Sequence, residues 1–182
     1  MNMPTLLNYD RGTRTLHWIT ATLVVALWML GQTIDWFPRG DARTAARGTH
    51  IVLGATLACV LAVRIWWRSA GPGVHLPPAG AGPLDRVASI GHKVLYLLLI
   101  VTVGLGLANA WIRGDSLFGL FSIPAFDPGN KTLRTTVEDW HGLAANVLLF
   151  VAFGHACAAL FHQLVLKDGV LRRMLPGLRS RR

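Results

Sequence analysis

Residues 140–166 read WHGLAANVLLFVAFGHACAALFHQLVL, an apolar segment without a single charged side chain. A run of this length predicts a membrane-spanning helix, because about 20 apolar residues cross the hydrocarbon core of a bilayer. The segment nevertheless carries three histidines, His141, His155 and His162. Polar groups are costly inside a bilayer, so their presence indicates a functional site.

The three histidines recur on one face of the predicted helix. At about 100° per residue, the fourteen steps from His141 to His155 return to within roughly 40° of the starting direction. The two rings are then roughly 21 Å apart along the axis, and His162 follows on the same face. Imidazole is a common ligand of haem iron. We therefore expect two haems stacked through a membrane.

The composition supports a small integral membrane protein. Of 182 residues, 52% are hydrophobic and 15% are charged, and the net charge is +9. The basic residues flank apolar runs, so lipid headgroups and membrane topology explain the charge better than nucleic acid does. Cys59 and Cys157 lie within apolar segments and are expected as free thiols. No C-x-x-C-H motif occurs, which excludes haem attached in the c-type manner.

The hydropathy pattern predicts an all-α protein, a four-helix bundle in the membrane that forms a single domain over residues 1–182. Its helices are expected near residues 15–36, 48–67, 90–112 and 140–166, followed by a basic tail over 167–182. The first run is long for a signal-peptide core and is interpreted as a retained anchor. His75 lies in a Gly- and Pro-rich connector, where a solvent-exposed histidine is the simplest interpretation.

The distribution of basic residues predicts the orientation. Twelve of the 18 Lys and Arg residues fall on the side that holds both termini and the second loop, and six fall on the other side. Cytoplasmic loops are enriched in Lys and Arg. We therefore expect both termini in the cytoplasm and four antiparallel helices between the two faces.

Each span begins with a histidine. Counting residues from the outer boundary of the membrane, at about 1.5 Å per residue, gives the depth of every histidine in the bilayer. Histidines at matching depths form three pairs, which are His50 with His141, His17 with His155, and His92 with His162. The first two pairs predict the axial ligands of an outer and an inner haem, because the iron needs imidazoles from opposite sides. The third pair lies at the inner interface and suits a proton-handling quinone site.

Histidines inside a membrane also have other uses. A single intramembrane histidine often only bonds a neighbouring helix, and this interpretation stays open for His92 and His162. A metal-ion transporter usually adds carboxylates or thiolates to its histidines. The span interiors lack Asp and Glu, which favours haem. Trp18 and Trp140 adjoin proposed ligands but are interpreted as interfacial aromatic residues.

Four motifs carry a resemblance to a known family. They are R-x-x-R-T-L-H-W in the first helix, a histidine opening the second, G-H-K-V-L-Y-L-L in the third and W-H-x-x-x-A-N…H-A-x-A-A-L-x-H in the fourth. Over nearly the whole chain this pattern resembles the bacterial cytochrome b561 family. The resemblance implies a multi-pass protein of the bacterial inner membrane that contains two haem b groups and acts as an oxidoreductase.

The resemblance also implies a reaction and its residues. Characterised members are implied to be superoxide oxidases, which pass electrons from superoxide to ubiquinone. The family's axial ligands fall on His17, His50, His141 and His155, and His92 and His162 match positions near the quinone. Related cytochrome b subunits take electrons from a partner dehydrogenase or hydrogenase, which is the alternative. Basic residues expected to attract superoxide or hold haem propionates are Arg39, Arg43, Arg47, Lys131 and Arg134.

Overall fold

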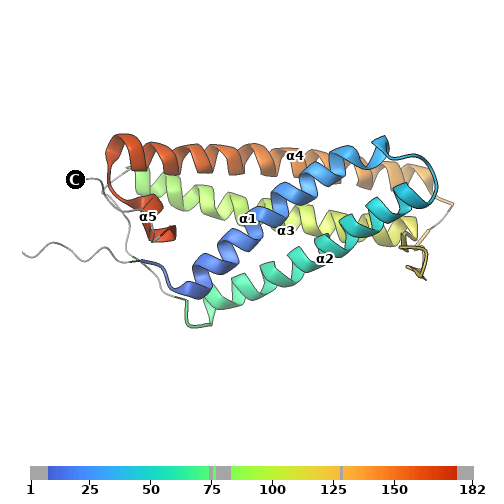
Figure 1. Cartoon of the computed structure of the whole chain (residues 1–182), viewed down its shortest axis with the longest axis horizontal. Helices are drawn as coiled ribbons and strands as arrows, with labels where there is room; N and C mark the ends of the chain where they lie inside the picture. Colours follow the sequence, from blue (N-terminus) through green and yellow to red (C-terminus); the bar gives the residue numbers. More distant parts are fainter. Residues whose placement is uncertain (1–7, 74–75, 77–82, 128, 176–182) are drawn as a thin grey trace, which may run out of the picture.

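The structure, a computed structural model, describes residues 8–73, 76, 83–127 and 129–175. Four long helices dominate it (Figure 1), namely α1 Arg11–Thr33, α2 Asp41–Ser69, α3 Pro83–Arg113 and α4 Lys131–Phe161. The shorter elements are η1 Ile34–Trp36, β1 Ser116–Leu117, β2 Phe121–Ser122, the π-helix η2 His162–Leu166 and α5 Val170–Met174.

All four long helices are long and apolar enough to cross a membrane. The prediction of a largely helical protein with four spans is therefore confirmed. The helices begin earlier than predicted, since α2 starts at Asp41, α3 at Pro83 and α4 at Lys131. Hydropathy marks only the part of a helix that lipid tolerates, whereas backbone hydrogen bonding continues into the polar turns beyond. The predicted tail also contains a short helix, α5, and His75 lies outside the described residues.

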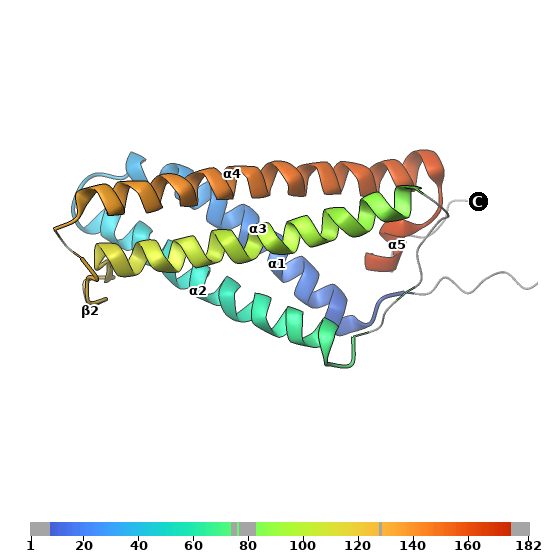
Figure 2. The ribbon, with the colours of Figure 1, turned by 180° about the vertical axis from the view of Figure 1, so that it is seen from behind.

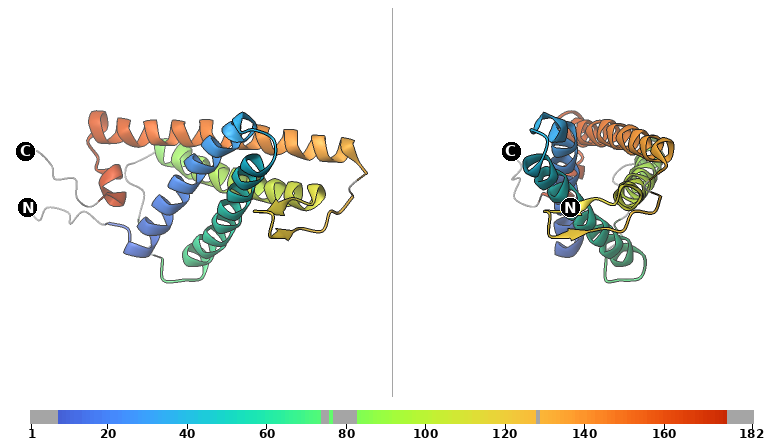
Figure 3. Two further views of the ribbon diagram at one scale, coloured as in Figure 1. Left: turned by 45° about the vertical axis from the view of Figure 1, so that its right-hand side comes forward. Right: turned by 90° about the vertical axis from the view of Figure 1, so that its right-hand side faces the viewer.

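The helices pack as two pairs. The most extensive contacts join α3 to α4 and α1 to α2, and fewer contacts join α1 to α4. In Figures 1 and 2, α3 and α4 run alongside each other while α1 and α2 are inclined to them. Both views of Figure 3 show the same arrangement from other directions, with the β1–β2 hairpin at one end of the bundle.

Leucines from all four helices form the core. The buried cluster comprises Leu27, Leu57, Leu61, Leu99 and Leu148. Many other apolar side chains are exposed, including Phe150 at 78% and Phe153 at 68%. Such exposure on long apolar helices is what a lipid environment requires, because the hydrocarbon solvates these side chains.

Side-chain caps and a backbone contact organise the helix ends. Asp10 Oδ1 accepts from Thr13 N at 2.8 Å at the start of α1, and Asn130 Oδ1 accepts from Leu133 N at 2.9 Å at the start of α4. Tyr9 N donates to Arg173 O at 3.2 Å, so the two ends of the described chain meet. This contact agrees with an even number of membrane crossings.

Candidate functional site

Two pairs of histidines face each other across the bundle, one nearer each end of α4. His50 of α2 lies opposite His141, with ring centroids 6.1 Å apart. His17 of α1 lies opposite His155, with ring centroids 6.4 Å apart. The structure thus brings together both histidine pairs that sequence depth predicted.

The spacing of each pair matches two imidazoles on one metal ion. Metal–imidazole bonds are about 2 Å long, and each ring nitrogen lies roughly 1 Å from its ring centre, so the two centres should be about 6 Å apart. A direct hydrogen bond between the rings would bring them closer together. The residues present therefore fit a planar cofactor whose iron binds one histidine from each side.

A cavity of about 250 Å³ surrounds the His50–His141 pair and reaches all four long helices. His141 Nδ1 donates to the Thr102 carbonyl oxygen at 3.1 Å, because a carbonyl only accepts. This hydrogen bond fixes the tautomer and leaves Nε2 with a free lone pair toward a metal. His50 Nδ1 is buried and has no hydrogen-bond partner among the described residues.

Two glycines allow neighbouring helices to approach these rings closely. A Cβ added at Gly106 of α3 would come within 3.0 Å of His141 Cε1. One added at Gly31 of α1 would come within 3.3 Å of His50 Cε1. Small residues at such positions let helices and flat groups share a narrow space. Both glycines also line the cavity, so a larger residue at either position would crowd the histidine rings.

Alternating charges close the end of this cavity that lies next to β1. Arg113, whose side chain is 6% exposed, contacts Glu138 at 2.9 Å and Asp115 at 3.4 Å, and Arg47 lies 3.8 Å from Asp115. Burial raises the pKa of Asp115, although the two guanidiniums act in the opposite direction. Of the five basic residues proposed from sequence, only Arg47 lines the cavity. Arg43 instead bonds Asp35 and the Phe37 carbonyl within the first loop.

His92 does not lie where sequence depth placed it. Its ring centroid is 5.2 Å from that of His155, about two helical turns from His162. The prediction that His92 and His162 lie at the same depth was therefore wrong. Counting residues along each helix does not record how far packing shifts α3 against α4, so the relative depth of His92 could not be obtained from the sequence.

His162 has a different partner, Asp168. His162 Nδ1 and Asp168 Oδ2 are 2.5 Å apart, across the π-helix that ends α4. Burial alone would raise the pKa of Asp168, but hydrogen bonds from His162 and from Val170 N lower it. The adjoining turn needs left-handed backbone at Lys167 (φ 55°) and Gly169 (φ 77°).

Several polar contacts of the site are not predicted by the sequence. Arg64, an arginine within an apolar run of α2, is half-buried and lies 3.1 Å from His17 Nδ1. Trp28 Nε1 donates to Asn146 Oδ1 at 2.8 Å between α1 and α4. The spacing of residues within one helix predicts neither contact. An arginine inside an apolar run does, however, indicate a buried polar partner.

Fold and site together define a membrane-spanning four-helix bundle with paired histidines between its helices. The chain matches the prokaryotic cytochrome b561 family over residues 8–177 and belongs to that family. Members of this family bind haem b, transfer electrons within the membrane and interact with quinones.

Curated relatives cover almost the whole chain. A protein of Yersinia pestis named "Probable superoxide oxidase CybB" is 32% identical over 91% of this chain and 94% of its own length. "Cytochrome b562" of Cereibacter sphaeroides is 34% identical over 92% of this chain and 94% of its own length. "Cytochrome b561 homolog 1" of Escherichia coli is 32% identical over 88% and 93%.

Proposed function

We propose that this chain is a superoxide oxidase that holds two b-type haems, an outer haem between His50 and His141 and an inner haem between His17 and His155. The observation that carries the proposal is the spacing of the two pairs, 6.1 and 6.4 Å between ring centroids, at two levels of α4. The name of the Yersinia pestis relative supports the choice of superoxide. We further propose that both termini lie in the cytoplasm and that the membrane is the bacterial inner membrane.

The proposed reaction moves electrons inward. Two superoxide ions each give up one electron and become dioxygen, and ubiquinone takes up the two electrons with two protons to form ubiquinol. When bound, haem supplies the one-electron redox chemistry between these two reactants.

The chain's own residues prepare each part of this route. The hydrogen bond from His141 Nδ1 to Thr102 holds the imidazole in one orientation and tautomer. Arg47 and Arg113 place positive charge at the outer end of the cavity, where an anion arrives, while Asp115 and Glu138 confine that attraction to a small area. At the inner end, His162 with Asp168 is proposed to hold a proton for the quinone, and His92 is the second proposed quinone-site residue.

One assay on the purified, haem-loaded protein tests the proposal. We expect two low-spin haems per chain, reduction of both by superoxide, and reoxidation on addition of ubiquinone. The variants His50→Ala and His141→Ala should each lose the outer haem and keep the inner one. His75→Ala, which removes a histidine outside the pairs, serves as the matched control.

Three results would separate the alternatives. A single haem, or loss of both haems in His141→Ala, would contradict the paired-ligand arrangement. A protein with two haems that is inert to superoxide until a dehydrogenase partner is added would favour the partner-subunit function. Binding of a transition-metal ion in place of haem would favour a transporter, although the described residues contain no group of three or more metal-ligating side chains.

A further inference from the structure

Arg64 points into the bundle near its inner end. Its guanidinium lies 3.1 Å from His17 Nδ1, and its Cζ is 5.1 Å from the ring centre of Tyr96. An aromatic face and one ring nitrogen use only part of a guanidinium, which has five N–H donors. Among the residues that the structure describes, most N–H donors of the Arg64 guanidinium therefore have no acceptor.

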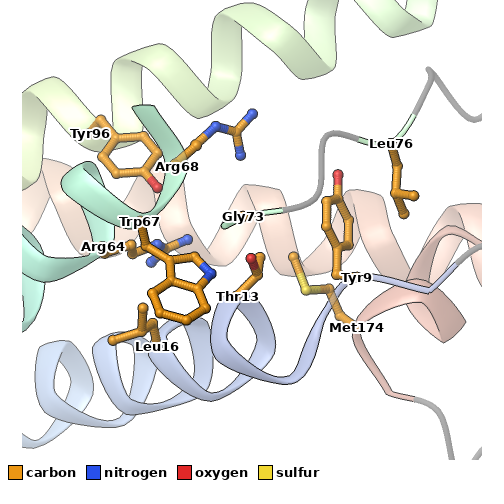
Figure 4. A pocket seen from close by; sticks show the side chains of 10 residues that line it. All are labelled: Tyr9, Thr13, Leu16, Arg64, Trp67, Arg68, Gly73, Leu76, Tyr96 and Met174. Carbon is orange, nitrogen blue, oxygen red and sulfur yellow. The ribbon is translucent and has the colours of Figure 1, made fainter. Parts of the chain in front are cut away.

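A small cavity of about 60 Å³ adjoins Arg64 (Figure 4). Arg64, Arg68, Tyr96 and Tyr9 line it together with Thr13 and Trp67. Figure 4 shows Arg64 and Arg68 on the same helix, α2, with the Tyr96 ring of α3 beside them. A polar cavity of this size has room for one small oxyanion group or a few waters.

The charges around this cavity are unbalanced. Arg68 is exposed and has no hydrogen bond or ion pair with any residue that the structure describes. The carboxylate of Asp10 accepts hydrogen bonds from Trp67 Nε1 at 3.1 Å and from Thr13 N and Oγ1, so it caps α1 and anchors Trp67. The lining of the cavity itself contains two guanidiniums and no carboxylate.

The geometry points to an oxyanion site between Arg64 and Arg68, which takes a carboxylate or a phosphate group. Guanidinium groups bind both anions through paired N–H donors, and Tyr96 and Tyr9 add hydroxyl donors at the cavity wall. The contact between Arg64 and His17 links the site to the inner histidine pair.

Two molecules at this depth carry such a group. One is the haem proposed between His17 and His155, through its propionate carboxylates, and this source rests on the proposed function. The other is an anionic lipid of the adjacent leaflet, through its phosphate, and this source does not depend on haem. Both use the same chemistry, and two experiments separate them.

The haem experiment uses Arg68→Gln, because Arg68 lines the cavity, whereas the contact with His17 that a substitution would break belongs to Arg64. In lipid-free, neutral detergent, transfer of the inner haem to apomyoglobin should become at least tenfold faster, as expected for the loss of a charge-assisted hydrogen bond. The midpoint potential of the inner haem should also fall, because a nearby positive charge stabilises the reduced form. Arg68→Lys should restore much of both values.

The lipid experiment counts bound lipids on the wild-type chain by native mass spectrometry. Phosphatidylglycerol should be retained at least tenfold more strongly than phosphatidylcholine, and Arg68→Gln and Arg64→Gln should abolish the difference. Arg11→Gln is the matched control, since Arg11 has the same charge at the same end but does not line the cavity.

The outcomes of the two experiments identify the source of the bound oxyanion group or refute the proposed site. A change in the haem experiment alone identifies a haem carboxylate, and a change in the lipid experiment alone identifies a lipid phosphate. If Arg68→Gln behaves like Arg11→Gln in both experiments, and Arg64→Gln behaves like Arg11→Gln in the lipid experiment, the inference is overturned. If the wild-type chain binds no haem at all, the proposed function fails, while the lipid experiment still tests the oxyanion site.

Discussion

Replacing Gly106 with alanine is the sharpest test of how the outer site is built. The new Cβ would lie 3.0 Å from His141 Cε1, whereas ordinary contacts of this kind fall between 3.4 and 4 Å. The ring must therefore move by about half an ångström, which is the tolerance within which a ligand geometry has to be held. We expect the outer haem to be bound less tightly and the inner haem to be unaffected.

The size of the effect follows from two opposing contributions. Crowding a packed site costs about 1–3 kcal/mol. Exchanging glycine for alanine within a helix favours the helix by about 1 kcal/mol. The second contribution strengthens the helix with or without haem, so it leaves haem affinity unchanged. The crowding acts on the ligand itself, so the affinity for the outer haem should fall by roughly tenfold to a hundredfold.

Gly104→Ala provides the matched control on the same helix. A Cβ at Gly104 meets nothing within 4 Å, so this variant gains the helix preference without crowding His141. Haem content by pyridine haemochrome and a redox titration that resolves two haems would be measured for both variants. Equal retention of the outer haem by Gly106→Ala and Gly104→Ala would refute the reasoning.

Three further predictions concern the scaffold. Leu148→Ala should lower the free energy of unfolding by about 2–4 kcal/mol in a detergent denaturation assay, because Leu148 lies in the core and is 4% exposed. Leu143→Ala is the control and should change this free energy little, because Leu143 is 53% exposed. Burial raises the pKa of Asp115, so the folded chain binds the carboxyl proton more tightly than the unfolded chain does. The free energy of unfolding should therefore fall as the pH rises from the pKa of the unfolded state through the pKa of the folded state. Asp115→Asn should flatten this part of a thermal-stability profile, and an unchanged slope would contradict the assignment. Trp28→Phe removes the 2.8 Å hydrogen bond to Asn146 and should lower the free energy of unfolding by about 0.5–1.5 kcal/mol. A double-mutant cycle with Asn146→Leu that shows no coupling would exclude this hydrogen bond as a source of stability.

The sequence was a reliable guide where the signal lay along one chain segment. The apolar runs predicted four helices because a bilayer demands both their length and their lack of charge. The pairing of His50 with His141 and of His17 with His155 could be predicted because helical rise converts residue number into depth. Both pairs face each other in the structure.

Depth counting failed for His92, because a count along each helix does not record how far packing shifts α3 against α4. In the structure His92 lies beside His155, and His162 bonds Asp168 instead. The quinone roles of His92 and His162 stay predictions.

By itself the sequence determined the helices, the membrane environment and the family, because each depends on the local chemistry of single segments. Only the tertiary structure decided which polar groups meet across helices. Arg64 turns toward His17, Thr102 accepts from His141, and Gly106 gives that ring its space. These contacts depend on helix rotation and crossing angle, which packing sets and which no spacing within one helix encodes. The apolar stretch that begins at Trp140 thus carries His141 and His155, and the neighbouring helices carry the residues that contact them.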